Sequence, residues 1–254
     1  MNKPLYESYL QAKSDKKASY ARDLASYLNI SEAELTHARV GHDAKRLRND
    51  VQELLKALSK VGEVKAITRN DIAVHEHLGE YTNARFSDHA GLILNPRAMD
   101  LRFFFAYWSS IFALTEETSK GTRYSIQFFD MHGDALHKVY ATDNTNMDEW
   151  DALIQSFLLE ENPILDITPV EPYSNTPVSN ELAEQLEQQW RSMTDVHQFF
   201  KLLKENNLSR QQAFKAVPDD LAYQVDNNAL KTLLELAKEA QNEIMIFVGS
   251  RGCV

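Results

Sequence analysis

The chain has 254 residues, of which 43% are apolar, and a formal net charge of -10 at pH 7. This length and apolar content allow one large folded unit or two smaller ones. A net negative charge repels a phosphate backbone, and the Lys and Arg residues form no run, so the composition argues against nucleic-acid binding. A local basic pocket for a small anionic ligand is compatible with it.

Targeting signals are missing from the sequence. The first 17 residues contain no apolar segment of signal-peptide type, and the longest apolar run, Phe103 to Trp108, is too short to cross a bilayer. The lone Cys253 cannot form an internal disulfide, which fits a reducing compartment. We therefore expect a soluble, cytoplasmic protein that is not embedded in a membrane.

The first half of the chain changes its hydrophobic period once. Residues 7–60 have the pattern of helices, with Ser31 placed as an N-cap and Glu34 three positions later, and an apolar stripe ends at Gly62. From Glu63 onward, short segments rich in β-branched and aromatic residues alternate with turn formers, which predicts an antiparallel meander. The segments are VKAITRN, IAVHEHL, GLILN, LRFFFAYW, FALTEE, YSIQFFD and ALHKVYATD. An amphipathic helix over EWDALIQSFLLEE completes the unit.

The second half repeats the first. LLKALSKVGEVKAI, from Leu54, parallels LLELAKEAQNEIMIF, from Leu233, and LNISEAEL parallels NNLSRQQAF, in which Ser209 corresponds to Ser31. We predict an α+β fold of two tandem repeats, each a helical cap with an antiparallel β-meander sheet, the second incomplete. The predicted division is a first repeat over residues 1–165, a linker containing three of the seven prolines over 166–186, and a truncated second repeat over 187–254.

His197 is the first candidate ligand. Beside it, Val196, Phe199, Phe200 and Leu203 have the spacing of a stripe that a helix buries. A neutral imidazole on a helix is a standard axial ligand of haem iron, but a histidine at the edge of a core with satisfied hydrogen bonds explains the pattern as well.

The other histidines are weaker candidates for a metal ligand than His197. His132 and His137 flank a predicted hairpin turn and are expected to be exposed, whereas His75 and His77 lie at i, i+2 on one strand face and could form a metal pair. The sequence contains no HExxH or paired CxxC motif for zinc, no GxGxxG or GxxxxGK[ST] motif for nucleotides, and no GxSxG motif for a nucleophilic serine.

Two arginines are the other candidates. In DLRFFFAYW, strand alternation places Arg102 and Phe104 on the same sheet face. This face is either solvent-exposed or the wall of a pocket, in which Arg102 would supply a permanent charge over a planar ligand and Phe104 a stacking surface. Arg210 follows the Ser209 cap at a helix N-terminus, where carboxylates are favoured. A solvated arginine in the first turn is the more common explanation of such a residue.

Seven segments of the chain carry a family resemblance: AITRND, AVHEHLGEY, HAGLILNPRAMDLRFF, SIQFFDMHGDALHKVYATDNT, WRSMTDVHQFFKLLK, NNLSRQQAF and NEIMIFVGSRGC. They resemble the bacterial haemin-degrading and haem-transport family of the HemS/ChuS type. Members have two repeated halves and hold haem in a cleft between them. The resemblance implies that His197 is the proximal iron ligand, that Arg102 faces the distal side with a catalytic role, that Phe104 packs on the porphyrin, and that Arg210 pairs with a propionate.

The resemblance also implies a function in haem uptake and iron acquisition. Family members act on imported haem, and they open the porphyrin and release iron when an external electron donor is present, so the cytoplasmic side of a haem importer is an expected partner. A haem carrier without catalysis needs the same ligands and stays an alternative. Family members continue through a second complete sheet, so we expect from this chain either retained but weaker haem binding or a poorly folded C-terminal portion. From a different class, a protein-interaction module that uses the acidic surface and an exposed strand edge is the remaining alternative.

Overall fold

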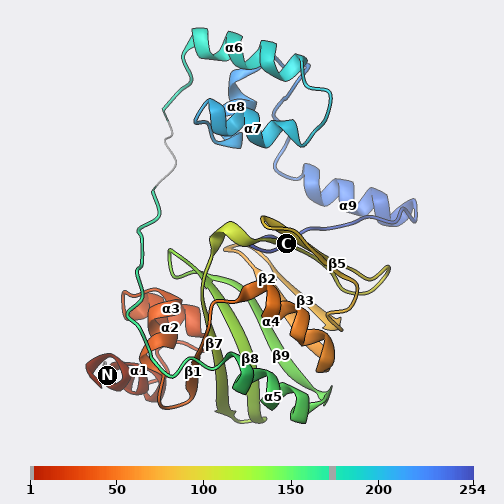
Figure 1. Ribbon diagram of the computed structural model, residues 1–254. Helices are drawn as coiled ribbons and strands as arrows, with labels where there is room; N and C mark the ends of the chain where they lie inside the picture. Colours follow the sequence, from red (N-terminus) through yellow and green to blue (C-terminus); the bar gives the residue numbers. More distant parts are fainter. Residues whose placement is uncertain (1–2, 172–175) are drawn as a thin grey trace. The chain divides into compact units, whose positions relative to one another are not determined.

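The computed structural model describes residues 3–171 and 176–254, which form two compact units (Figure 1). The first unit consists of Met1–Pro169 together with Ile246–Val254, and the second of Val170–Met245. Residues 246–254, which the sequence grouped with the second repeat, thus belong to the first unit. Part of the expected linker, residues 172–175, lies outside the described residues, and helix α6 already begins at Asn180.

The first unit carries two antiparallel sheets and their covering helices. Its larger sheet has the strand order β1-β7-β8-β9-β2-β3, and its smaller sheet the order β4-β5-β6. The helices are α1 (Lys3–Ser14), α2 (Ala21–Tyr27), α3 (Glu32–Ala38), α4 (Val51–Ala57) and α5 (Met147–Phe157). The strands are β1 (Ala44–Leu47), β2 (Gly62–Arg69), β3 (Val74–Gly79), β4 (Ala84–Phe86), β5 (Ala90–Leu94), β6 (Asp100–Phe104), β7 (Trp108–Thr118), β8 (Gly121–Asp130) and β9 (Ala135–Thr145). The predicted α+β class with antiparallel sheets is confirmed.

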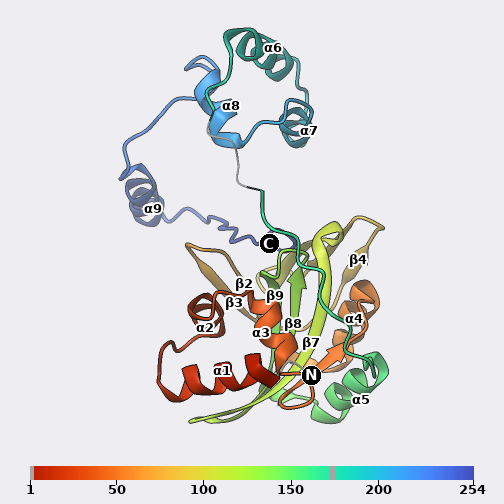
Figure 2. The same ribbon diagram turned by 90° about the vertical axis from the view of Figure 1, so that its left-hand side faces the viewer.

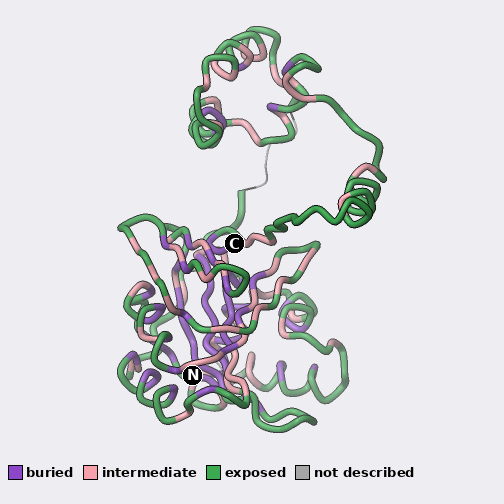
Figure 3. Tube along the Cα trace, turned by 90° about the vertical axis from the view of Figure 1, so that its right-hand side faces the viewer, coloured by how far each residue is buried: buried purple, intermediate pink, exposed green. Residues whose placement is uncertain are grey.

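Helices cover both faces of the larger sheet (Figure 2). On one face, Leu54 and Leu58 of the α4 region and Trp150 of α5 pack against strand residues such as Phe128 in the main core. On the other face, Ala33 of α3 packs against a smaller apolar cluster from β7 and β8. The buried residues therefore concentrate in the strands, as Figure 3 shows.

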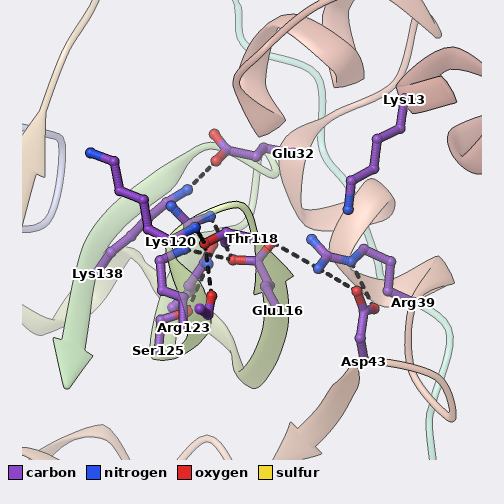
Figure 4. Close-up of polar contacts among 12 residues, drawn as sticks. Lys13, Glu32, Arg39, Asp43, Glu116, Thr118, Lys120, Arg123, Ser125 and Lys138 are labelled. Carbon is purple, nitrogen blue, oxygen red and sulfur yellow. Dashed lines mark hydrogen bonds and ion pairs between the residues drawn. The ribbon is translucent and has the colours of Figure 1, made fainter. Parts of the chain in front are cut away.

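Ion pairs fix the N-terminal helices to the second face of the sheet (Figure 4). Arg39, at the end of α3, is almost fully buried and contacts Asp43 at 2.8 Å and Glu116 of β7 at 2.9 Å. Burial alone would raise the pKa of Glu116, but Arg39 and Arg123 lower it below its ordinary value. Because unpaired buried charge is costly, this network specifies one position of α3 on the sheet.

The last residues of the described chain pair with the edge of β6 through an isolated antiparallel bridge between Phe103 and Cys253. The backbone N–H of Arg102 donates to the Val254 carbonyl at 2.7 Å, and the N–H of Val254 donates back at 2.9 Å. Trp108 donates through Nε1 to the Gly252 carbonyl, and Arg251 pairs with Asp130. A Cβ atom at position 252 would lie 2.7 Å from the Trp108 ring, so only glycine allows this close approach.

The described part of the second unit is helical. It contains α6 (Asn180–Arg191), α7 (Gln198–Glu205), α8 (Arg210–Ala216) and α9 (Ala229–Glu239). Leu186, Leu202, Leu203 and Ala213 form its small core, and Trp190 packs against Phe199 at its edge. Helix α9 buries none of its residues, although it repeats the sequence of α4.

The backbone carries the repeat that the sequence predicts. Ser31 and Ser209 both form capping boxes, with Glu34 and Gln212 respectively. Two residues before each cap, Asn29 and Asn207 have left-handed φ angles of 55° and 50°. Asparagine tolerates this conformation better than most side chains, and at this position it ends one helix before the next begins. The same helix–turn–helix is thus present in both units.

Two local expectations were wrong. Residues 44–47, within the segment read as helical, form strand β1, which pairs with β7. His137 is buried on β9 rather than exposed, because Phe103 of the smaller sheet packs against its ring. Among the helices of residues 3–171 and 176–254, none combines the length and apolar content that a bilayer crossing requires.

Candidate functional site

Arg102 and Phe104 project from the same face of β6. Their neighbours Leu101 and Phe103 are buried in the main core, so the predicted alternation holds along this strand. The side chain of Arg102 is 37% exposed and Phe104 is 44% exposed. The strand ends at Phe104, where a short 3₁₀ turn over Phe105–Tyr107 leads into β7.

This face of the smaller sheet is hollowed. A cavity of about 370 Å³ is lined by residues of β4, β5 and β6, including Arg85, Arg102 and Phe104. Arg85 pairs with Leu92, which pairs with Arg102, so the two arginines lie in one row across three strands. A Cβ atom at Gly91 would lie 2.6 Å from the Phe86 ring, so only glycine at this position lets the Phe86 ring lie this close to β5.

The guanidinium of Arg102 has one aromatic and one acidic neighbour. It lies over the ring of Phe247, 4.5 Å from the centroid, and its Nη2 atom is 3.6 Å from Oδ2 of Asp100. The ion pair is longer than a hydrogen bond, so it restrains the arginine weakly. The hollow therefore contains a permanent positive charge beside an exposed phenylalanine.

On the second unit, His197 lies immediately before α7 and is 87% exposed. Its Nδ1 atom is 2.6 Å from Oδ1 of Asp195, which also accepts a hydrogen bond from the backbone N–H of His197. These bonds lower the pKa of Asp195. A carboxylate that holds one imidazole nitrogen orients the ring and leaves the other, Nε2, available to a metal.

The predicted apolar stripe beside His197 is only partly buried. Leu203 is buried and Phe199 half-buried, whereas Val196, which precedes the helix, is 77% exposed and Phe200 is 61% exposed. Arg210, the first residue of α8, lies over the ring of Phe200 at 4.8 Å. His197 and Arg210 thus lie near the same exposed surface of the second unit, because Phe200 is one turn beyond His197.

The histidine pair on β3 has no further ligands. The rings of His75 and His77 are 4.0 Å apart, but no group of three or more metal-binding side chains occurs in the part of the chain that the structure describes. A stable metal site usually needs at least three protein ligands. The pair of His75 and His77 is therefore not supported as a metal site.

Sequence reasoning missed three residues of these sites. Asp195 could have been found, since a carboxylate two positions before a ligand histidine can reach its ring. Arg85 and Phe247 could not. Only the strand register brings Arg85 to Arg102, and only residues 246–254, the returning segment that rejoins the first unit, bring Phe247 there.

A comparison with protein families decides the relationship. The model of the haemin-degrading HemS.ChuX domain matches residues 29–157 and 207–254, which is more than half of the chain. The chain belongs to this family. Its two matched segments begin at Asn29 and Asn207, the repeated left-handed asparagines, in agreement with two repeats.

Three HemS.ChuX relatives illustrate the similarity. The hemin transport protein HmuS of Yersinia pestis is 61% identical over 255 residues, a match that covers all of this chain and 73% of HmuS. The solved heme degrading enzyme ChuS of Escherichia coli O157:H7 is 53% identical with a TM-score of 0.88, covering 98% of this chain and 73% of ChuS. The heme-binding protein PhuS of Pseudomonas aeruginosa, in its holo form, is 35% identical with a TM-score of 0.85 and the same coverage.

Proposed function

We propose that this protein binds haem as a substrate or cargo of bacterial haem utilisation and that it degrades haem to release iron. The observation that carries the proposal is the state of His197, an exposed imidazole whose Nδ1 atom is engaged by Asp195 while Nε2 is available. The 61% identity to a hemin transport protein over the whole chain supports haem, rather than a bare metal ion, as the ligand.

The proposed roles of the residues follow from their chemistry. Nε2 of His197 coordinates the iron, and Asp195 keeps the ring in place and makes the nitrogen a better donor. Phe104 offers an apolar surface to the porphyrin, and Arg210 a cation to a propionate. Haem itself supplies the redox chemistry, for which an external electron donor is needed. That one haem molecule contacts residues of both halves stays a prediction.

Arg102 is the proposed catalytic residue. Its guanidinium is permanently charged and its N–H groups are free of hydrogen bonds among the described residues, so it can donate to negative charge that develops on a bound ligand. The hollow beside Phe104 places this donor next to an apolar surface on which a ligand can lie.

Titration with haemin, followed at the Soret band, tests the binding proposal. We expect a shifted band with the unaltered protein, its loss or displacement with His197→Ala, and affinity about 10- to 100-fold weaker with Asp195→Asn, the typical effect of losing an outer-shell partner. His132→Ala is the matched control, because it removes a histidine of the first unit that bonds the Thr168 carbonyl. An unchanged spectrum with His197→Ala refutes the proposal.

Transport without degradation is the second candidate, and the descriptions of HmuS as a hemin transport protein and of PhuS as a heme-binding protein favour it. Incubation of the haem complex with a reductant in air separates the two functions. Decay of the Soret band with iron release supports degradation, whereas a stable band supports a carrier that delivers haem. Arg102→Ala should slow the decay much more than it weakens haem binding, and an equal loss of both would contradict the catalytic role.

A further inference from the structure

The position of the Arg102 side chain depends on a residue 145 positions later in the sequence. Both backbone groups of Arg102 bond to Val254, so the returning segment lies along β6 at this residue. From the same segment, Phe247 places its ring 4.5 Å from the guanidinium carbon. Phe247 is itself half exposed, so its ring is not explained as part of the core.

Few other contacts restrain this guanidinium. Within residues 3–171 and 176–254, no hydrogen bond reaches it, and the ion pair with Asp100 is 3.6 Å long. Arginine side chains without partners sample many rotamers, and ordering one of them costs conformational entropy. A ring against the flat face of a guanidinium restricts these rotamers and leaves the N–H groups at its edge available.

We propose that Phe247 is a positioning residue for Arg102. It holds the guanidinium by a cation–π contact within the hollow of β4, β5 and β6, with the N–H donors directed to a ligand beside Phe104. The contact exists because the returning segment pairs with β6. The role of the Phe247–Arg102 contact in haem chemistry rests on the proposed function. The contact itself is observed in the structure and does not depend on that proposal.

The first experiment needs no haem. The Nε–H signal of Arg102, assigned by its disappearance in Arg102→Ala, should show an upfield ring-current shift in a ¹⁵N–¹H spectrum. Phe247→Leu should move this signal to the position of a free arginine, whereas Phe247→Tyr should preserve it. Ile246→Ala, which removes a neighbouring exposed apolar side chain of the same segment, is the control and should leave it unchanged. A signal that Phe247→Leu does not move overturns the proposal.

The second experiment measures hydrogen-bond donation in the ferric haem complex with fluoride, an anion that accepts hydrogen bonds at the iron. A cation–π contact at an exposed site contributes about 0.5 to 1 kcal/mol, so Phe247→Leu should weaken fluoride binding about two- to five-fold. Phe247→Tyr should restore it. In an Arg102→Ala background, Phe247→Leu should have no further effect, because the ring acts through the arginine.

The outcomes separate the two proposals. If Phe247→Leu weakens fluoride binding equally with and without Arg102, the ring acts directly on the ligand and the positioning role is wrong. If the unaltered protein binds no haem, the proposed function fails, and the haem-free spectrum still decides whether Phe247 positions Arg102.

Discussion

A buried histidine should make the first unit sensitive to acid. His137 is fully buried in the main core, where the Tyr81 hydroxyl bonds Nε2 and the Thr68 hydroxyl oxygen lies 3.1 Å from Nδ1. Burial lowers the pKa of His137 from 6.5 to about 3, against a smaller opposing effect from the backbone of Ile67. A neutral imidazole with a proton on Nδ1 satisfies both contacts, because Nδ1 then donates to Thr68 and Nε2 accepts from Tyr81. A second ring proton, on Nε2, would replace the hydrogen bond that Tyr81 donates.

The sign and size of the effect follow from this pKa. Between about pH 6.5 and pH 3 the unfolded chain binds a proton at His137 and the folded chain does not, so the free energy of unfolding decreases as the pH falls. The loss is about 2 kcal/mol at pH 5 and approaches about 5 kcal/mol below pH 3. His137→Gln lacks the titrating group, so we expect it to lose about 2 kcal/mol less than the unaltered protein between pH 8 and pH 5.

Urea unfolding at pH 8 and pH 5 measures this difference through tryptophan fluorescence, to which Trp108 contributes from beside the imidazole. His132→Gln is the control, since His132 lies in the turn between β8 and β9, outside the core. Protonation of carboxylates affects all three proteins alike and cancels in the comparison. An equal pH dependence in His137→Gln and the unaltered protein would refute the reasoning.

Three further predictions concern other residues. Burial raises the pKa of the Cys253 thiol to about 12, so a thiol reagent at pH 8 should label Cys253 only after denaturation, and rapid labelling of the folded protein would contradict its burial. Loss of the helix caps in Ser31→Ala and Ser209→Ala should each cost about 1 kcal/mol, seen as lower melting temperatures; no change in either would argue against the capping boxes. Arg39→Met removes the partner of Asp43 and leaves Glu116 with Arg123 alone, so it should destabilise the first unit by about 3 kcal/mol at pH 7 in chemical denaturation. The loss should be smaller at pH 4, because Glu116, whose pKa Arg39 no longer lowers, takes up a proton more readily; a loss that does not depend on pH would count against this network.

Local sequence patterns predicted most of the elements. Caps, apolar spacing and turn residues depend on neighbours within about four positions, so Ser31, Ser209 and the meander strands were recognisable from the chain itself. Strand β1 was not, because its four residues gain their conformation only by pairing with β7. His137 was misplaced for the same reason: it is buried because the smaller sheet packs over its own sheet, which no local pattern encodes.

The candidate site also combines features that the sequence predicted with features that required coordinates. Alternation along β6 identified the shared face of Arg102 and Phe104, and the resemblance assigned them roles that stay predictions. The hollow itself arises from the register across three strands, which aligns Arg85 with Arg102. Phe247 reaches Arg102 through a contact between distant parts of the chain, so its part in the site required coordinates.

The returning segment makes the first unit discontinuous, with the whole second unit inserted between Pro169 and Ile246. The second unit is therefore joined to the first by two chain connections rather than one. A protease that cuts once within the insert would leave two fragments still joined through the hydrogen bonds of Val254 and the Arg251 ion pairs. Conversely, a chain that stopped at Pro169 would expose the outer edge of β6 and deprive Arg102 of both its backbone partner and its aromatic neighbour.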